Sequence, residues 1–510
     1  MNGQADPGPL RAGLDGQFSL VEELPQSRSC TYFDSFDWRL HAAGCTLRKE
    51  LVEGECCFIL SGAEAVEGSL VLEDDLAVRF ARDFPEGPLQ EKLAVILEVR
   101  ALFPVARLLV REQTWRVVNH DQEPLLKLCF SENTLQSTGV RKRQLLLSRL
   151  RVLPVKGHRD VARQVEQILQ EGFGLTPSED SLLQEALTAL GKKAGGDPPR
   201  VRLQLDGAMR TDAAAKAILL GQLDILEANE AGTVAALDTE FLHDFRVAVR
   251  RTRSLLGQIK EIFPNKKLMR FRDGFAWLGQ VTGPTRDLDV YLLHYDDYVT
   301  ELPLEVRDDL QPLHTFLQTR QQKEQARLAK ALRSHRYRQL VDRWRIFLQA
   351  PLPARTTLGN AMRPVSQVAG EQIAQAYRRV IKQGKRITRA SPASDLHRLR
   401  KSCKKLRYLL EFFQSLYPPT KITKLIKGLK LLQDNLGAFQ DLEVQSAALR
   451  EMSQQMVAEQ ETPAETLVAM GMLVASLNRK QQQVRKAFKA QFAEFHKAKY
   501  RRLFEDLFPS

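Results

Sequence analysis

The stretch FLHDFRVAVRRTRSLL at residues 241–256 returns in altered form as DLHRLRKSCKKLRYLL at residues 395–410. An α-helix turns by 100° per residue, so side chains three, seven and ten positions apart share one narrow face. The first copy carries such a basic stripe, made of His243, Arg246, Arg250 and Arg253. To the stripe of the second copy we assign His397, Arg400, Lys404, Lys405 and Arg407. Both stretches are therefore predicted to be helices with a basic face and a neighbouring apolar face.

A second motif repeats at the same distance along the chain. WLGQVTGPTRDLDV at 277–290 corresponds to LLQDNLGAFQDLEV at 431–444, and His243/His397 and Asp287/Asp441 are both 154 residues apart. Two unrelated helical segments would rarely share two motifs at one offset. We interpret residues 201–510 as a duplicated all-helical domain, with halves at about 201–350 and 355–510 that form two pseudo-symmetric four-helix bundles.

The front of the chain follows another pattern. Short apolar runs such as CCFIL and TWRVV, separated by turn residues, predict strands between residues 18 and 155, and residues 158–190 change to helical spacing. Residues 1–17 and 191–200 are rich in Gly, Pro and charged residues, which is typical of a flexible tail and a linker. The predicted fold is therefore an α+β domain over 18–190, followed by the all-α domain.

Charge is distributed unevenly between these regions. The chain of 510 residues has a formal net charge of +13, but residues 239–510 contain 48 basic and 27 acidic residues and the rest contains 27 and 35. A polyanionic partner is thus expected on the helical domain. The six cysteines form no CxxC pair, and no uncharged apolar run of about 18 residues exists, so we expect no zinc ribbon, no membrane span and a cytoplasmic location.

The like charges within each row repel one another, which costs free energy. This cost is explained if an anion lies along the row. Arginine suits bidentate phosphate contact and lysine supplies a point charge. The alternative is an ordinary solvated helix face. The acidic pairs Asp287/Asp289 and Asp441/Glu443 could hold Mg²⁺, but we favour a role in orienting the basic side chains. No nucleophile motif accompanies His243 or His397 in the sequence, so we expect these histidines to bind rather than to act in acid–base catalysis.

The duplicated H-x-x-R-x-x-x-[RK]-[RK]-x-R helix and the [RQ]-D-L-[DE]-V segment resemble the CHAD family, the conserved-histidine α-helical domain. The resemblance covers about 201–510 and implies two four-helix bundles whose basic faces line a central channel. Members of that family bind inorganic polyphosphate, and some locate to polyphosphate granules. Carried over by position, the implied polyphosphate ligands are His243, Arg246, Arg250, Arg251, Arg253, Arg286, His397, Arg400, Lys404, Lys405 and Arg407.

TYFDSFDWRLHAAGCTLRKE at 31–50 is similar to the signature of the CYTH family, a triphosphate tunnel often fused ahead of CHAD domains. That resemblance implies an antiparallel β-barrel with Glu-rich strands that hold a metal. Near residues 18–24 this sequence offers only the adjacent Glu22 and Glu23, which point to opposite faces of a strand. Arginines and a serine replace the late acidic strand. The remaining candidates for phosphate contact are Arg48, Lys49, Arg111 and Arg116.

Without its acidic ligands, such a barrel should not activate water for phosphoryl hydrolysis. We therefore expect a degenerate CYTH-like scaffold, no enzyme activity, no cofactor and no bound metal. The leading hypothesis is a polyphosphate-binding protein, cytoplasmic and associated with polyphosphate granules. The alternatives are a metal-dependent triphosphatase and a nucleic-acid-binding protein. Nucleic acid is disfavoured because few aromatic residues accompany the two stripes.

Overall fold

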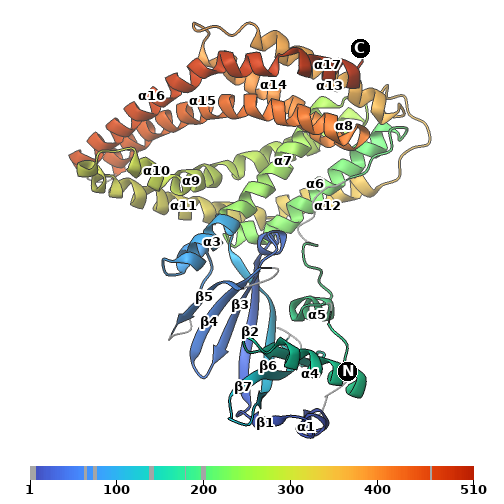
Figure 1. Ribbon diagram of the computed structural model, residues 1–510. Coiled ribbons are helices and arrows are strands. Elements are labelled where there is room, and N and C mark those ends of the chain that lie inside the picture. Colours follow the sequence, from blue (N-terminus) through green and yellow to red (C-terminus); the bar gives the residue numbers. More distant parts are fainter. Residues whose placement is uncertain are drawn as a thin grey trace. The chain divides into compact units, whose positions relative to one another are not determined.

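The computed structural model describes residues 7–62, 66–72, 77–136, 143–178, 180–196, 203–459 and 462–509. The chain divides into two compact units, Met1–Pro198 and Pro199–Ser510. The first unit is built on an antiparallel sheet and the second is helical (Figure 1). The predicted fold class, an α+β domain followed by an all-α domain, is confirmed.

The first unit contains a nine-stranded antiparallel sheet with the central strand order β5-β4-β3-β2-β6-β7-β8, in which β1 also pairs with β6 and β9 with β7. Its strands are β1 (Ser19–Glu22), β2 (Gln26–Ser35), β3 (Thr46–Val52), β4 (Glu55–Ser61), β5 (Val66–Leu72), β6 (Leu102–Val118), β7 (Pro124–Leu135), β8 (Gln144–Leu145) and β9 (Arg149–Pro154). Its helices are α1 (Pro7–Asp15), α2 (Arg39–Ala42), α3 (Pro88–Leu97), α4 (Arg159–Phe173) and α5 (Leu182–Ala189). Alternating burial along β4 and much of β2 gives the sheet one covered face.

The flexible tail predicted for residues 1–17 is wrong for the part that the structure describes, because helix α1 begins at Pro7. Leu10 and Leu14 lie one turn apart and are fully buried against Trp115 and α4. Burying two leucines outweighs the weak helix propensity of a Gly- and Pro-containing segment. Residues 1–6, and residues 197–200 of the predicted linker, lie outside the described residues.

The duplication predicted from the sequence appears directly in the helix boundaries of the second unit. Three helices of the first half begin 154 residues before their counterparts: α6 at Thr211 and α13 at Val365, α7 at Thr239 and α14 at Ala393, and α8 at Asn265 and α15 at Pro419. The helices are α6 (Thr211–Val234), α7 (Thr239–Gln258), α8 (Asn265–Val281), α9 (Gly283–Leu293), α10 (Tyr295–Thr300), α11 (Gln311–Leu332), α12 (His335–Gln349), α13 (Val365–Gly384), α14 (Ala393–Phe412), α15 (Pro419–Glu459), α16 (Ala464–Phe495) and α17 (Ala498–Leu507).

The two halves differ where one long helix is interrupted. In the first half Thr282 separates α8 from α9, and Pro284 follows at the second position of α9. Proline has no N–H to donate and clashes with the preceding turn, so it favours the start of a new helix. The equivalent residue of the second half is Ala438, and α15 continues without interruption for 41 residues.

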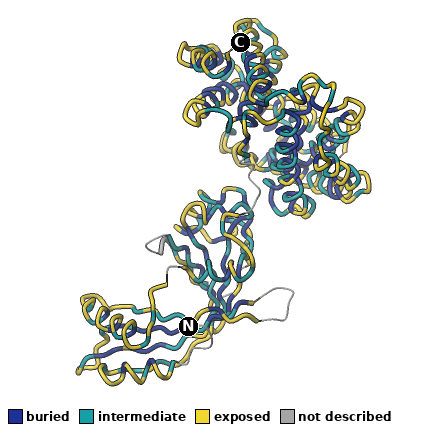
Figure 2. The backbone as a smooth tube through the Cα atoms, turned by 90° about the vertical axis from the view of Figure 1, so that its right-hand side faces the viewer, coloured by how far each residue is buried: buried dark blue, intermediate teal, exposed yellow. Residues whose placement is uncertain are grey.

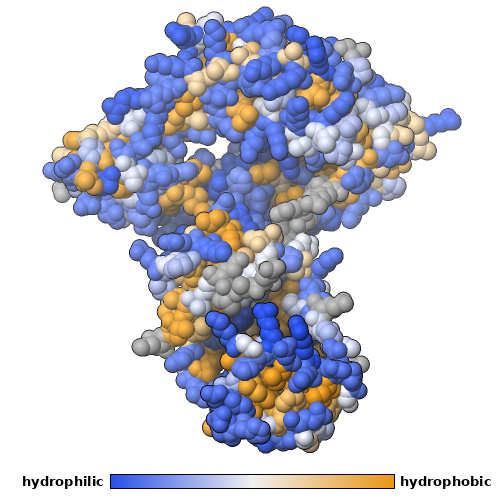
Figure 3. Space-filling view, viewed as in Figure 1, coloured by the Kyte–Doolittle hydropathy of each residue, from blue (hydrophilic) through white to orange (hydrophobic). Residues whose placement is uncertain are grey.

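Both halves contribute to two separate hydrophobic cores of the helical unit. The larger core joins α6, α7, α8 and α12 to α13, α14, α17 and the first part of α15. The smaller core joins α9, α10 and α11 to the later part of α15 and the first part of α16. Figure 2 shows the buried residues following one side of many of these helices. Figure 3 shows openings through the helical unit, between the layer that contains α15 and the layer that contains α9 in Figure 1.

Candidate functional site

Arg246 is the best-anchored cation of the α7 stripe. Its Nη1 donates to Thr282 Oγ1 at 2.9 Å and to the carbonyl oxygen of Gly279 at 3.3 Å, both at the end of α8. Thr282 is fully buried and in turn donates to the carbonyl of Leu278. Burial lowers the pKa of the Arg246 guanidinium from its ordinary value, as does the charge of Arg250. Arg246 is thus held in place by neutral acceptors.

Arg286, on α9, joins this group through the histidine of the stripe. Its Nη2 donates to His243 Nδ1 at 3.0 Å, and its Nη1 donates to the carbonyl of Thr239 at 3.1 Å. A guanidinium group can only donate, so Nδ1 of His243 must accept and carries no proton. Glu240 lies 3.8 Å from the same guanidinium group. In this arrangement His243 is a neutral ring that orients Arg286.

The α14 stripe is anchored differently, by side chains of α15. Arg400 donates to Gln440 Oε1 at 2.8 Å and to Asp441 Oδ1 at 3.3 Å. His397 Nε2 lies 2.7 Å from Glu443 Oε2, and because an ionised carboxylate can only accept, Nε2 donates this hydrogen bond. The orienting role that we favoured for the acidic motif therefore fits Asp441 and Glu443.

The acidic motif of the first half makes other contacts. Asp289 is buried and accepts from Gln321 Nε2 at 2.8 Å. Burial raises the pKa of Asp287, while Arg246 and Arg286 act in the opposite direction. Asp287 thus lies close enough to both guanidinium groups to attract them, and Asp289 instead ties α9 to α11.

The two stripes meet where α7 packs against α14. Burial lowers the pKa of Lys404 to about 8, and the charges of Arg400, Arg250 and Arg407 contribute in that order, while Asp441 acts in the opposite direction. Arg250 belongs to α7, so Lys404 is exposed to positive charge from both halves of the repeat. The Nε atoms of Arg246, Arg250 and Arg400 are buried, and in the described part of the chain they have no hydrogen-bond partner. The cluster is thus electrostatically unfavourable by itself.

Three of the cations named from the sequence occupy other positions. Arg251 forms an ion pair with Glu411, whose other oxygen lies 3.3 Å from Arg407 Nε. Lys405 lines a separate cavity with Lys260 and Arg379. Arg253 is exposed, and its guanidinium group lies against Gly279. A Cβ added at Gly279 would lie 2.9 Å from Arg253 Nη1. The structure thus brings Arg246, Arg250, Arg400, Lys404 and Arg407 together. Arg251 is linked to this group only through Glu411, Arg253 is exposed, and Lys405 lies apart.

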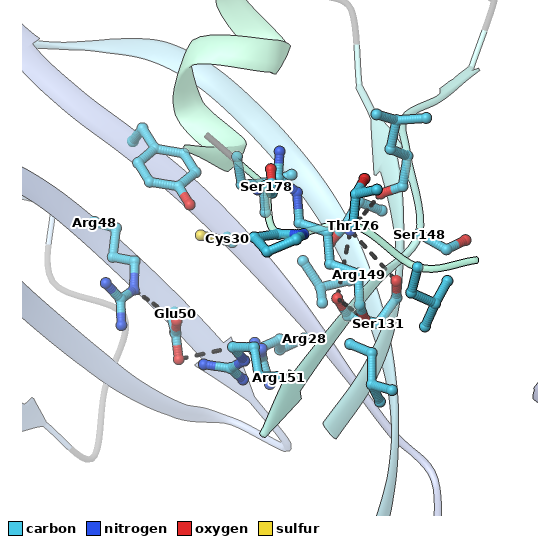
Figure 4. Close-up of a pocket in the computed structure, with 18 of the residues that line it drawn as sticks. Arg28, Cys30, Arg48, Glu50, Ser131, Ser148, Arg149, Arg151, Thr176 and Ser178 are labelled. Atoms are coloured by element: carbon cyan, nitrogen blue, oxygen red, sulfur yellow. Dashed lines mark hydrogen bonds and ion pairs between the residues drawn. The ribbon is translucent and has the colours of Figure 1, made fainter. Parts of the chain in front are cut away.

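The first unit contains a cavity of about 560 Å³ lined by Arg28, Arg48, Arg149 and Arg151, together with Glu50 (Figure 4). In Figure 4 Glu50 lies between Arg48 and Arg28, at 2.8 Å and 3.9 Å from their Nε atoms. Glu112 accepts from Arg28 at 2.8 Å and from Arg151 at 2.7 Å, and these contacts lower its pKa against the opposing effect of burial. Arg149 donates to Glu185 at 2.8 Å. The cavity's arginines are therefore already paired with carboxylates.

The two glutamates that remained from the expected metal-binding strand do not line this cavity. Glu22 pairs with Arg11, and Glu23 lies 3.1 Å from Arg116 Nε and 3.2 Å from Lys127 Nζ. Throughout the described residues, no group of three or more His, Cys, Asp or Glu could hold a metal ion. Glu50 and Glu112 are engaged by arginines, so the donor set does not fit the metal that the CYTH resemblance implies.

Of the other phosphate candidates in this unit, Arg48 alone lines the described cavity. Lys49 lies over the Phe58 ring, 5.4 Å from its centroid. Arg111 is exposed, and Arg116 is held by Glu23. Neighbouring residues of a strand point to opposite faces, which explains why Arg48 and Lys49 diverge.

Several positioning residues were not found from the sequence. Thr282 and Gly279 hold Arg246, but their counterparts in the second half are Leu436 and Gln433, so the repeat gave no signal. Glu411 follows Arg407 by four residues, a helix spacing that would have revealed the pair. Arg48 and Glu50 are two residues apart on β3 and share one face of the sheet, a spacing that would have revealed the carboxylate of the cavity.

Comparison with known proteins places the helical unit in a family. The family model of the CHAD domain matches residues 217–450. The crystal structure of the CHAD domain from the plant Ricinus communis is 26% identical, with a TM-score of 0.49, and covers 59% of this chain and 97% of its own. PptA from Streptomyces chartreusis is 16% identical, with a TM-score of 0.43, and covers 56% of this chain and 100% of its own. No protein of curated function matches the chain.

A third structure is similar over a smaller part of the chain. It is described as an adenylate cyclase of Bacillus halodurans, is 15% identical with a TM-score of 0.23, and covers 35% of this chain and 91% of its own. None of the described helices is both long enough and apolar enough to cross a membrane.

Proposed function

Because residues 217–450 form a CHAD domain, we propose that the helical unit binds inorganic polyphosphate along the basic stripes of α7 and α14. The protein binds the polymer without catalysing a reaction on it. We further propose that the protein is cytoplasmic and associates with polyphosphate granules. Its physical basis lies in the cations that the fold gathers and in the side chains that hold them.

The observation that carries the proposal is the convergence of two like-charged stripes at Lys404. Its pKa of about 8, lowered by burial and by cations of both halves against the opposing charge of Asp441, marks a place where positive charge is only partly compensated. A row of phosphates supplies one negative charge per unit at regular spacing. Such an anion removes the repulsion between the stripes and restores the full charge of Lys404.

The anchored arginines give the site its geometry. Arg246 and Arg400 occupy equivalent positions and are each held by acceptors of the following helix. Their orientation is therefore fixed before the ligand arrives, which reduces the side-chain entropy lost on binding. A phosphate oxygen can also accept from the partly unsatisfied guanidinium groups, and charge-assisted hydrogen bonds of this type are the stronger ones.

Binding to nucleic acid through the same face has less support. Single-stranded nucleic acids are held largely by stacking of bases on accessible aromatic rings. The aromatic residues closest to the stripes in sequence are Phe245, which is 0% exposed, and Tyr408, which is 7% exposed. Neither ring is accessible to a base. Simple electrostatic attraction to nucleic acid remains, and it depends steeply on salt.

Replacing both equivalent arginines tests the proposal. We expect the Arg246→Ala/Arg400→Ala variant to lose at least tenfold in affinity for long-chain polyphosphate in a calorimetric titration. The matched control is Lys480→Ala/Arg501→Ala, which removes two exposed charges elsewhere in the same unit. Unchanged binding in the first variant, or an equal loss in the control, would contradict the assignment of the stripes.

A further inference from the structure

The helical unit contains two cavities that are related by its internal repeat. One, of about 390 Å³, lies between α6, α7 and the end of α14, and the other, of about 370 Å³, lies between α13, α14 and the end of α7. Six lining positions of the first cavity recur in the second at an offset of 154 residues, and they include Arg251 and Lys405, Glu411 and Gly257, and Gln414 and Lys260. The two cavities thus lie at equivalent places in the two halves of the repeat, but the residues that line them differ in charge.

The charge of the first cavity is balanced within the protein. Arg251 is ion-paired with Glu411, and the same carboxylate approaches Arg407. The other residues around this cavity are apolar or uncharged, such as Ile218, Phe412 and Gln222. An anion that enters here would have to displace Glu411 from two guanidinium groups.

The second cavity lacks this carboxylate. Gly257 occupies the position equivalent to Glu411, and the lining contains the cations Lys260, Arg379 and Lys405. No acidic residue is among the described residues that line it. The neighbouring Glu261 faces elsewhere, because its Oε2 would lie 2.7 Å from a Cβ added at Gly359. Three like charges therefore surround one cavity without compensation from its walls.

The remaining polar groups of this cavity are amides. Gln258, Gln372 and Gln375 each bring an NH₂ group that can donate to an anion. Lys405 follows Lys404 by one residue, so it points about 100° away from the α14 stripe. The cavity is accordingly a site of its own rather than part of the row formed by Arg400 and Lys404.

We propose that this second cavity, defined by Lys260, Arg379 and Lys405, binds a short oligophosphate. A volume of 370 Å³ is near the lower end for ligand sites. It therefore takes either a free short chain or the last few units of a long one. The ligand class rests on the proposed function, but the site itself rests on the broken symmetry between Gly257 and Glu411.

The experiment introduces a carboxylate at Gly257, the position equivalent to Glu411 of the first cavity. A Cβ added at Gly257 meets no atom within 4 Å, so Gly257→Glu fits on α7 without a clash. The matched control is Gly471→Glu, at another open and exposed helical glycine of the same unit. Both variants change the net charge equally. Each is prepared in the full-length protein and titrated calorimetrically with tripolyphosphate and with long-chain polyphosphate.

We expect Gly257→Glu to weaken tripolyphosphate binding at least tenfold and Gly471→Glu to change it less than twofold. The Arg246→Ala/Arg400→Ala variant should keep its tripolyphosphate affinity. A parallel loss of long-chain affinity in Gly257→Glu identifies a chain end as the ligand, and an unchanged long-chain affinity identifies a free short chain. Equal tripolyphosphate binding in all proteins, or its loss in the double arginine variant, would overturn the inference. Absent long-chain binding with intact tripolyphosphate binding would overturn only the proposed function.

Discussion

Lys404 on α14 and Arg250 on α7 occupy equivalent positions of the two repeats, and their like charges act on each other where these helices pack together. Asp441 of the repeated acidic motif opposes this effect at Lys404, but burial and the neighbouring cations outweigh it. The duplication therefore produces two basic stripes, and the positive charges of one stripe repel those of the other. A polyanion is the ligand that turns this repulsion into binding energy.

Raising the pH should weaken polyphosphate binding through the titration of Lys404. The pKa of Lys404 in the free protein is about 8, and a bound phosphate favours the charged form. Affinity should therefore fall as the pH rises above 8, by up to about tenfold per pH unit. Arginines keep their charge in this range. Titrations between pH 7 and 9.5 should show this fall in the wild type and a flat, weaker profile in Lys404→Met.

The same substitution should stabilise the free protein. In the unfolded chain lysine has its ordinary pKa of about 10.4, so between pH 8 and that value the unfolded state binds more protons than the folded one. The stability of the wild type should therefore rise with pH in this window relative to Lys404→Met. At pH 7 the variant should be more stable by about 1 kcal/mol, after allowance for solvent screening. Denaturant unfolding at pH 7 and 9.5 measures both effects, and a less stable Lys404→Met would contradict them.

The first unit should release no phosphate from tripolyphosphate in the presence of Mg²⁺ or Mn²⁺. Metal-assisted hydrolysis needs carboxylates that are available to the ion. In the cavity of this unit Glu50 is held by Arg48, and the neighbouring Glu112 is held by Arg28 and Arg151. A phosphate-release assay on the full-length protein checks this expectation. Metal-dependent release that is lost in Glu50→Gln would show that these pairs open to admit a metal.

The sequence predicted the repeat and the helices that carry it because its signal is periodic. His243 and His397 share an offset that the helix starts at Thr239 and Ala393 reproduce. The prediction was less successful beside the stripe. Arg251 and Lys405 belong to the repeated motif, but each points about 100° away from the preceding cation, and a motif match does not record direction.

Contacts between distant segments could not be read from the pattern. Leu10 and Leu14 are two leucines in a Gly-rich segment, and only the surface around Trp115 makes them a buried helix face. The counterpart of Thr282 in the second half is Leu436, which has no side-chain acceptor, so the hydrogen bond of Thr282 with Arg246 appears only when α7 and α8 are packed. The pairing of Arg28 with Glu112 likewise depends on the register of β2 and β6, in which Gln26 faces Glu112.

The most direct test of the central claim is a competition titration of the full-length protein over a range of salt concentrations. Long-chain polyphosphate, single-stranded DNA and double-stranded DNA are compared at equal phosphate concentration, for the wild type and for Arg246→Ala/Arg400→Ala. We predict polyphosphate binding that survives excess DNA, weakens with salt and is lost in the variant. Equal binding of all three polymers, unchanged in the variant, would contradict the account, because the charge of the helical unit would then act without the stripes.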